Sequence, residues 1–224
     1  PPSLLPPPSV LSASLSSLST GYNTGVLAGA LLFLKPLHKP SPLEVGALVT
    51  ASTLGAVAGS SLSPPLLRRG RVPALRWTGY LFLLSSLLCA SVPTPAGAPL
   101  VPLALSRLLA GAAMGASSPA VPLYVAETSP VEKRGAYATV PQFMISLGIL
   151  LSYVSSLCVL SLRGPDWRLM FALGALPAGL QVALTYGERV LPETPRFLLG
   201  RGDRKGAERS LKLLRQGTKD VGEE

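Results

Sequence analysis

Charge is the scarcest feature of this sequence. Only 14% of its 224 residues are Asp, Glu, Lys or Arg, whereas a soluble domain usually carries about 25%. A chain with so little charge cannot cover a globular surface with solvated side chains, and 48% of its residues are hydrophobic. The composition therefore excludes an ordinary soluble domain and indicates a surface that faces lipid.

Histidine, cysteine and aromatic residues are also rare, and each shortage excludes a kind of chemistry. His38 is the only histidine, and Cys89 and Cys158 lie in apolar runs without Cys/His spacing, so we expect no metal site. No nucleophile elbow, phosphate loop or pair of carboxylates within an apolar run is present. The net charge of +9 comes without interleaved basic and aromatic residues. We therefore expect no enzyme, no catalytic residues, no cofactor and no nucleic-acid partner.

What the sequence does have is long apolar runs. A helix needs about 20 apolar residues to cross a bilayer, and internal Gly, Ser and Pro are tolerated in membrane bundles. The architecture that we predict is an all-α membrane bundle of six spans in residues 1–190, followed in 191–224 by the start of a cytoplasmic helical loop. The spans are predicted near Val10–Leu34, Leu43–Leu66, Val72–Val92, Leu100–Ala126, Ala136–Leu162 and Arg168–Tyr186.

Lysine and arginine fall mainly on one side of these spans. With a cytoplasmic N-terminus, fifteen lie inside, four lie outside, and Arg107 lies within a span. This asymmetry predicts a multi-pass protein with both ends in the cytoplasm, in the plasma membrane or an endomembrane.

The segment after the last span has a different pattern. Thr194 and Pro195 predict a helix start, and Ala207, Leu211 and Leu214 follow at helical spacing among basic residues. The pattern predicts an amphipathic helix along the cytoplasmic face. A solvated charged helix in an ordinary loop is the alternative.

Polar residues within the spans are the first candidate functional residues, because their burial in hydrocarbon costs several kcal/mol unless they are paired or line a cavity. Asn23 and Thr24 lie in the middle of the first run, and Gln142 lies early in the fifth. The amide of Gln142 can both donate to and accept from a sugar hydroxyl. For all three residues, a hydrogen bond between helices is an equal alternative.

Charged residues near the span ends form a second set of candidates. Glu127 and Arg134 bracket the connection between the fourth and fifth runs, and Glu193 and Arg196 follow the sixth. Opposite charges there can form a network that locks one conformation and breaks in another. Ordinary anchoring at the membrane interface is the alternative.

Two small-residue motifs predict helix packing. Gly55-x-x-x-Gly59 and Gly111-x-x-x-Gly115 allow helix backbones to approach closely. We expect no further role for them.

Several segments, in order along the chain, carry a specific resemblance. They are Gly21–Leu31, Arg107–Gly115, Val121–Pro130 with Arg134–Gly135, Gln142 with Gly148–Leu150, Trp167–Arg168 and Pro192–Phe197. Together they resemble the sugar porter family of the major facilitator superfamily, which comprises facilitated glucose transporters and proton-coupled sugar and polyol symporters. The resemblance implies an alternating-access carrier of twelve spans, with a sugar bound near the midplane between two six-span halves. This chain would be the N-terminal half, cut off in the central loop, and its partners would be the lipid bilayer and the missing C-terminal half.

The resemblance also implies roles for single residues. Gln142 matches a glutamine that contacts sugar, with Ile145 and Ile149 on the same wall, and Asn23 and Thr24 are further candidates for binding. The residues that match a cytoplasmic charge network, which stabilises the outward-facing state, are Glu127, Arg134, Glu193 and Arg196. Arg107 matches the arginine of the family's fourth span.

Asn23 bears on the transport mechanism. Proton-coupled relatives often have aspartate at the matching position, and asparagine cannot bind and release a proton. We therefore predict facilitative uniport of a hexose or related sugar. The alternatives are a proton-coupled sugar or polyol symporter and a non-transporting membrane protein that regulates full-length carriers.

The sequence departs from the family between the second and third spans. Arg68, Arg69 and Arg71 keep the basic part of the family's loop, but the usual acidic residue is missing and the loop is one residue shorter. This departure weakens the gating role that the resemblance implies for the loop.

Overall fold

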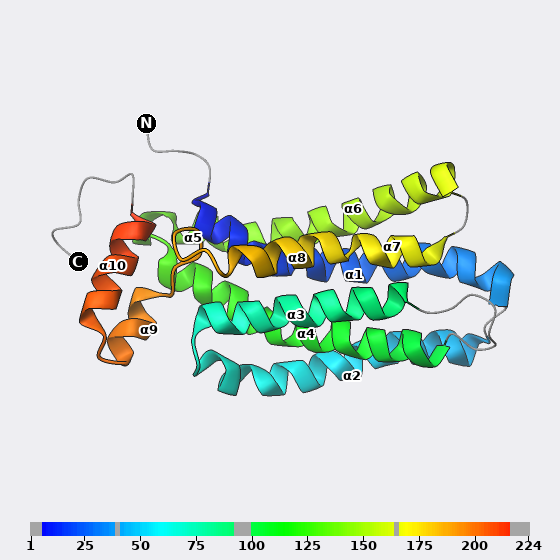
Figure 1. The fold of residues 1–224 in the computed structure, drawn as a ribbon, viewed down its shortest axis with the longest axis horizontal. Helices are drawn as coiled ribbons and strands as arrows, with labels where there is room; N and C mark the ends of the chain where they lie inside the picture. The colour runs from blue at the N-terminus through cyan, green and yellow to red at the C-terminus, as the bar shows by residue number, and fades with distance from the viewer. Residues whose placement is uncertain (1–5, 39–40, 92–99, 164–165, 216–224) are drawn as a thin grey trace.

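The computed structural model describes residues 6–38, 41–91, 100–163 and 166–215. Long helices run side by side as a bundle, and two short helices cover one end of it (Figure 1). The long elements are α1 (Pro8–His38), α2 (Pro42–Leu67), α3 (Arg71–Ala90), α4 (Leu100–Thr128), α6 (Val140–Arg163), and α7 (Trp167–Leu173) followed by α8 (Ala175–Leu184). The shorter elements are η1 (Val131–Lys133), α5 (Arg134–Ala138), α9 (Pro195–Gly200) and α10 (Arg204–Leu214).

Within the described residues, five helical stretches are long and apolar enough to cross a membrane. They overlap the second to sixth predicted spans and run over Pro42–Leu67, Arg71–Ala90, Val101–Thr128, Val131–Leu162 and Trp167–Leu184. The all-helical membrane fold is thereby confirmed. The division of the chain at residue 190 stays a prediction.

Helix α1 is long enough to span a bilayer, with 31 residues, but it is not among these five stretches. Its N-terminal half is rich in serine, and the serines lie on the inside of the bundle: Ser9, Ser12, Ser14, Ser16, Ser17 and Ser19 are all buried. Several of these hydroxyls bond locally, as Ser14 Oγ does to the Val10 carbonyl at 2.7 Å. Serine thus lowers the hydropathy of α1 without placing polar groups on its outer surface. That α1 is the first membrane span stays a prediction.

Glycine holds α1 against α6. Gly21, Gly25 and Gly29 recur every four residues on α1, and a Cβ at each would collide with Ile145, Ser152 or Ser156 of α6. From the other side, a Cβ at Gly148 would collide with the Leu18 carbonyl. Backbone contact of this kind replaces large side chains at the crossing.

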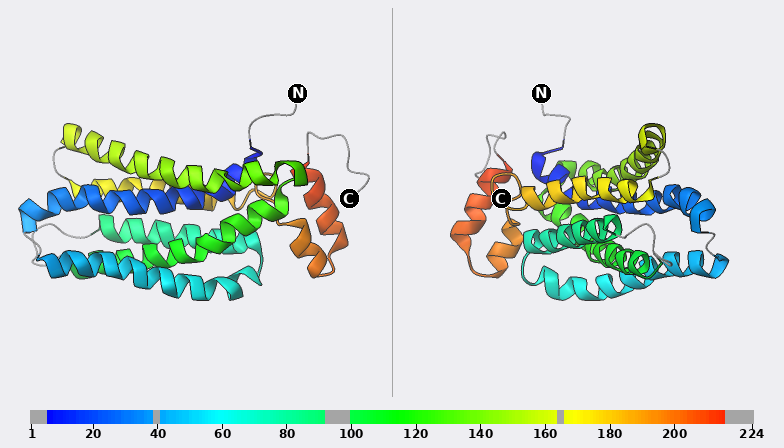
Figure 2. Two further views of the ribbon diagram at one scale, coloured as in Figure 1. Left: turned by 180° about the vertical axis from the view of Figure 1, so that it is seen from behind. Right: turned by 45° about the vertical axis from the view of Figure 1, so that its right-hand side comes forward.

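Helices α2 and α4 pack through the two predicted motifs. Side chains at Gly55 and Gly59 would collide with the carbonyls of Leu108 and Ala112, and Gly111 and Gly115 face α2 in the same way. The close crossing that the motifs predict is confirmed. Figures 1 and 2 show α2 and α6 along opposite edges of the bundle.

A buried amide ties α8 to α1 and α3. Gln181 is 1% exposed, and its Nε2 donates to Ser16 Oγ and to the Leu75 carbonyl, both at 2.6 Å. Phe82 of α3 and Ala178 of α8 add apolar contact nearby. Small polar groups therefore join these helices, and Gly79 of α3 also faces Gln181 and Val182 of α8.

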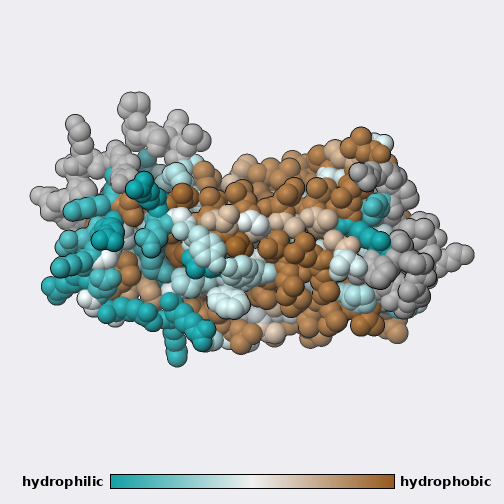
Figure 3. Space-filling model, in the orientation of Figure 1, coloured by the Kyte–Doolittle hydropathy of each residue, from teal (hydrophilic) through white to brown (hydrophobic). Residues whose placement is uncertain are grey.

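The outer surface has the polarity of a membrane protein. A broad hydrophobic band covers the middle of the bundle, and hydrophilic residues gather at the end that carries α9 and α10 (Figure 3). Large apolar side chains are exposed along the band, including Leu54, Val57 and Leu62 of α2 and Leu157 of α6. Such a surface is stable only against lipid or another apolar protein surface.

The helices that follow the bundle begin where predicted. Thr194 is the N-cap of α9 and Pro195 its first residue. In α10, Ala207 and Ser210 are buried while Lys205, Glu208 and Arg209 are exposed. The helix is amphipathic, and it lies across the end of the bundle (Figure 1). Its contact with a membrane face stays a prediction.

Candidate functional site

Arg107 and Asn23 meet in the interior of the bundle. Arg107 of α4 is 1% exposed, and its guanidinium donates to the Asn23 carbonyl and to Asn23 Oδ1, each at 3.1 Å. The ring of Phe171 lies 4.7 Å from the guanidinium carbon. Among the described residues no carboxylate pairs with Arg107, and its Nε has no partner. The site therefore consists of a buried positive charge held by an amide, a carbonyl and an aromatic face.

The orientation of the Asn23 amide follows from its neighbours. Its Nδ2 donates to the Ser19 carbonyl at 3.0 Å, so its Oδ1 is the atom left for the arginine. Sequence reasoning chose Asn23 and Arg107 separately. Only the structure brings them together.

The other predicted sugar-binding residues lie on α1 and α6. Thr24 is exposed, and its hydroxyl bonds to the Thr20 carbonyl of its own helix at 2.9 Å. Gln142 is exposed, while Ile145 and Ile149 are half-buried where α6 crosses α1. Their spacing of three and four residues puts all three on one side of α6. Contact of these residues with a sugar stays a prediction.

We expect Asn23→Ala to lower the free energy of unfolding by about 1.5–3 kcal/mol, because it removes a hydrogen-bond acceptor from a buried guanidinium. Thermal unfolding of the purified chain in detergent measures the change. Thr24→Ala is the matched control: its side chain is exposed and bonds only within α1, so its effect should stay within about 0.5 kcal/mol. Equal effects of the two variants would contradict a role for Asn23 in holding Arg107.

A second cluster lies at the end of the bundle that carries α9. Arg71 Nε and Nη2 donate to the two carboxylate oxygens of Glu127, both at 2.9 Å, and the Glu127 side chain is 5% exposed. Thr194 donates its hydroxyl to the same carboxylate at 2.7 Å, and the guanidinium of Arg71 lies over the Phe197 ring. One bidentate ion pair thus joins the start of α3, the end of α4 and the start of α9.

Glu193 caps α3 from a distant part of the chain. Its carboxylate accepts the backbone N–H of Arg71 at 3.0 Å and of Val72 at 3.2 Å, and also that of Thr194 at 3.0 Å. The N-cap of α3 is Gly70, whose φ of 137° excludes most side chains and which supplies no cap of its own. The loop before α3 lacks an acid, and Glu193 supplies the carboxylate instead.

The remaining predicted network residues lie outside this cluster. Arg134 and Arg196 are exposed, as are Arg68 and Arg69. Within the described part of the chain, none of these side chains has a recorded ion pair or hydrogen bond. Their part in a charge network stays a prediction.

Two contacts at this end of the bundle were not predicted from the sequence. Thr194 was predicted as a helix cap, but its bond to Glu127 was not. The bond from the Tyr124 hydroxyl to the Pro192 carbonyl, at 2.9 Å, was also not predicted.

Burial raises the pKa of the Glu193 carboxyl, and its backbone N–H donors and Arg71 offset only part of that rise. A carboxyl with a raised pKa releases its proton more readily in the unfolded chain than in the native one. The stability that it contributes is therefore largest at acid pH and is lost as pH rises through the raised pKa. We expect thermal unfolding, compared between wild type and Glu193→Gln from about pH 4 to 7, to show this loss in the wild type only. A relative gain of wild-type stability over that range would contradict it.

Neither cluster has the side chains of a metal site. Over the described ranges, no three His, Cys, Asp or Glu side chains lie close enough to hold a metal ion. The side chains of the two clusters instead join helices to one another through hydrogen bonds and one ion pair.

Comparison with known proteins gives a consistent result. The family model described as "Sugar (and other) transporter" matches residues 9–224. A D-xylose transporter of Levilactobacillus brevis is 36% identical over 192 residues, which cover 84% of this chain and 40% of the relative. The glucose transporter GlcP of Staphylococcus epidermidis is 34% identical over 204 residues, which cover 89% of this chain and 43% of the relative.

Solved structures agree with these relatives. The proton:xylose symporter XylE bound to 6-bromo-6-deoxy-D-glucose matches with a TM-score of 0.82 and 28% identity, over 93% of this chain and 49% of that one. An inward-open structure of XylE from E. coli matches with a TM-score of 0.78.

The chain spans about half the length, or less, of the relatives that it matches. The part that it matches is their N-terminal half. By the matched family model and the fold, this chain belongs to the sugar transporter family of the major facilitator superfamily.

Proposed function

We propose that this chain forms one half of a facilitative carrier that moves a hexose or related sugar by alternating access, without a coupled ion. Sugar transport by the family is the basis of the proposal. The single observation that carries the uniport assignment is the contact between Arg107 and Asn23. The second half, which would complete the central cavity, is the other component of the carrier.

Proton coupling needs a group that binds and releases a proton as the carrier turns over. The partner of the buried arginine here is an amide, which does not titrate in the physiological range. Glu44 lies in the first turn of α2 and Glu127 at the end of α4, so neither carboxylate lies at mid-depth in a helix. Over the described residues, no carboxylate therefore lies where it could serve as a proton site within the bundle, whereas one solved structure of XylE is described as that of a proton:xylose symporter.

The sugar site is proposed on the exposed sides of α1 and α6. Thr24 and Gln142 are exposed there and can exchange hydrogen bonds with hydroxyl groups. Ile145 and Ile149 would give an apolar wall beside them. In the isolated half this surface has nothing opposite it, so substrate binding would require the second half.

The charged end of the bundle is proposed to be cytoplasmic. Arg68, Arg69, Arg71 and the basic residues of α10 gather at this end, as positive charge does on the cytoplasmic side. The Arg71–Glu127 pair and the Glu193 cap join helices there, and we propose that they stabilise the outward-facing state. Both ends of the chain would then lie in the cytoplasm, at the plasma membrane or an endomembrane.

Uptake of radiolabelled sugars tests the substrate class. The gene that encodes this chain, expressed whole in cells that lack hexose uptake, should give saturable uptake that unlabelled hexoses inhibit. Empty-vector cells are the control. Correct surface expression without uptake of any hexose, pentose or polyol would favour a non-transporting role.

A further inference from the structure

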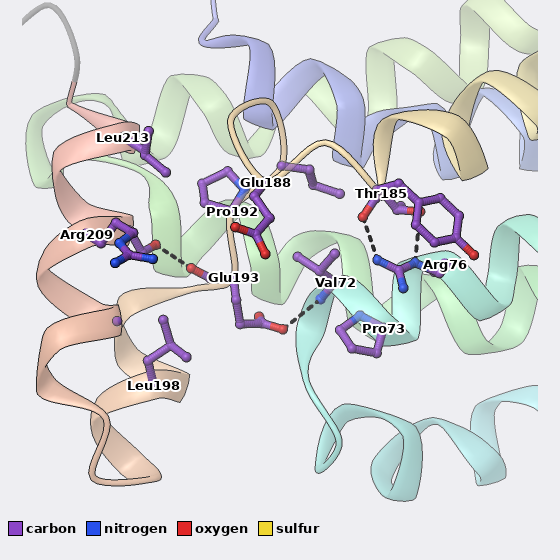
Figure 4. Close-up of a pocket in the computed structure, with 14 residues that line it drawn as sticks. Val72, Pro73, Arg76, Thr185, Glu188, Pro192, Glu193, Leu198, Arg209 and Leu213 are labelled. Carbon is purple, nitrogen blue, oxygen red and sulfur yellow. Dashed lines mark hydrogen bonds between the residues drawn. The ribbon is translucent and has the colours of Figure 1, made fainter.

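A pocket of about 450 Å³ lies beside the charged cluster (Figure 4). The start of α3, the connection from Thr185 to Glu193, and α9 and α10 form its walls. Two interactions hold these walls in place. Arg76 donates to Thr185 Oγ1 at 3.2 Å and to the Thr185 carbonyl at 2.7 Å, and the Ser210 hydroxyl donates to the Glu193 carbonyl. The volume is within the range of small-molecule sites.

Three charged groups of this pocket have unused hydrogen-bonding capacity. Arg76 uses Nε and Nη2 for Thr185, which leaves further N–H donors of its guanidinium. Arg209 and Glu188 are exposed, and neither has a recorded side-chain partner within the described residues. The carboxylate of Glu193, by contrast, is taken up by backbone N–H groups. The charged groups that can still bind a ligand in this pocket are therefore two guanidinium groups and one carboxylate.

An apolar surface continues from the pocket along the outside of α3. Arg76 stacks on the Tyr186 ring, 4.1 Å from its centroid. Trp77, Tyr80 and Tyr186 are exposed beside it, and Leu84 and Leu87 are exposed farther along α3. Helix α3 is one of the stretches that can cross a membrane. Tyrosine and tryptophan next to a basic residue are typical of the level at which lipid headgroups lie.

We propose that this pocket binds the headgroup of an anionic phospholipid of the phosphatidylserine type, with its acyl chains along the exposed face of α3. Arg76 holds the phosphate at the membrane side of the pocket, because a guanidinium matches phosphate oxygens in geometry and charge. Arg209, which comes from α10 on the other side of the pocket (Figure 4), binds the carboxylate of the headgroup. The Glu188 carboxylate accepts a hydrogen bond from the ammonium group of the same headgroup.

The charge pattern separates this headgroup from others. Phosphatidylcholine carries no carboxylate for Arg209 and an ammonium without N–H donors for Glu188. In phosphatidylglycerol the phosphate is the only charged group, so this headgroup offers Arg209 no carboxylate and Glu188 no ammonium group. The proposal is independent of which sugar, if any, the carrier moves.

Native mass spectrometry of the purified chain tests the proposal by counting the lipids that it retains from mixed detergent micelles. We expect phosphatidylserine to be retained above phosphatidylglycerol and phosphatidylcholine, and Arg209→Gln to weaken its binding about tenfold. Glu188→Gln should weaken phosphatidylserine binding and strengthen phosphatidylglycerol binding. Lys212→Gln is the matched control, because Lys212 is exposed on the same helix and does not line the pocket.

Three results would overturn the proposal. Equal losses for Arg209→Gln and Lys212→Gln would show attraction to general surface charge instead of a site. Equal retention of the three lipids would show that the charged groups of the pocket do not select phosphatidylserine. If soluble O-phosphoserine displaces phosphatidylserine at equal concentration, the pocket binds the headgroup chemistry from solution and the lipid assignment is wrong.

Discussion

Glu127→Gln is expected to lower the free energy of unfolding by about 3 kcal/mol, because it removes one member of a buried ion pair and leaves the other charge without its partner. The Glu127 and Arg71 side chains are only 5% and 17% exposed, so water cannot replace the lost interaction well. Glutamine has nearly the same size and can still accept from the Thr194 hydroxyl, which limits the change to the charge. Thermal or denaturant unfolding of the purified chain in detergent measures it.

The matched control is Glu132→Gln, at an exposed carboxylate a few residues farther along the chain. Its effect should stay within about 0.5 kcal/mol, as for most surface substitutions. If the two variants are equally stable, the Arg71–Glu127 pair does not hold α3, α4 and α9 together.

Replacing both Gly55 and Gly59 by alanine should cost about 3 kcal/mol or more, since each new methyl group collides with a backbone carbonyl of α4 that cannot move aside as a side chain would. The two helices must then separate along their whole crossing. Unfolding in detergent again gives the magnitude.

Gly46→Ala is the control for this variant, and its effect should have the opposite sign. Gly46 lies on the same helix with no atom near the position of a new Cβ, so alanine should stabilise α2 by about 0.5–1 kcal/mol. A neutral Gly55/Gly59 double variant would mean that α2 does not pack on α4 through these glycines.

Apolar run length and glycine spacing predict most of this fold. The second to sixth spans follow from runs of about 20 apolar residues, and the two GxxxG motifs locate the α2–α4 crossing. The first helix is harder, because its serines lower the hydropathy while facing inward. Helix length and hydropathy alone do not distinguish such a helix from a half-polar surface helix.

The contacts of the candidate site are less predictable than its residues. The sequence contains several arginines at the predicted cytoplasmic ends of the spans, and nothing in their spacing selects Arg71 over Arg134 as the partner of Glu127. The choice depends on how the start of α3 meets the end of α4, which is a property of the packed bundle. Glu193 likewise caps a helix that begins more than a hundred residues earlier in the chain, a contact that no local pattern can indicate.

The buried arginine connects the packing of the helices with the proposed transport mechanism. Arg107 of α4 reaches α1 across the interior of the bundle, where its guanidinium donates to both the carbonyl and the side-chain amide oxygen of Asn23. The partner of this charge is an amide, which does not bind or release a proton at physiological pH. This is the physical reason to expect transport that follows the sugar gradient alone.

Sugar uptake with and without a proton gradient is the most direct test of this central claim. The whole gene product would be expressed in cells that lack hexose uptake, and initial rates of labelled hexose entry would be measured before and after a protonophore is added. Downhill uptake that is unchanged by the protonophore, with no accumulation above the external concentration, is the result that we predict. Uptake that concentrates the sugar and collapses with the protonophore would contradict it, and a proton-coupled symporter would replace the uniporter.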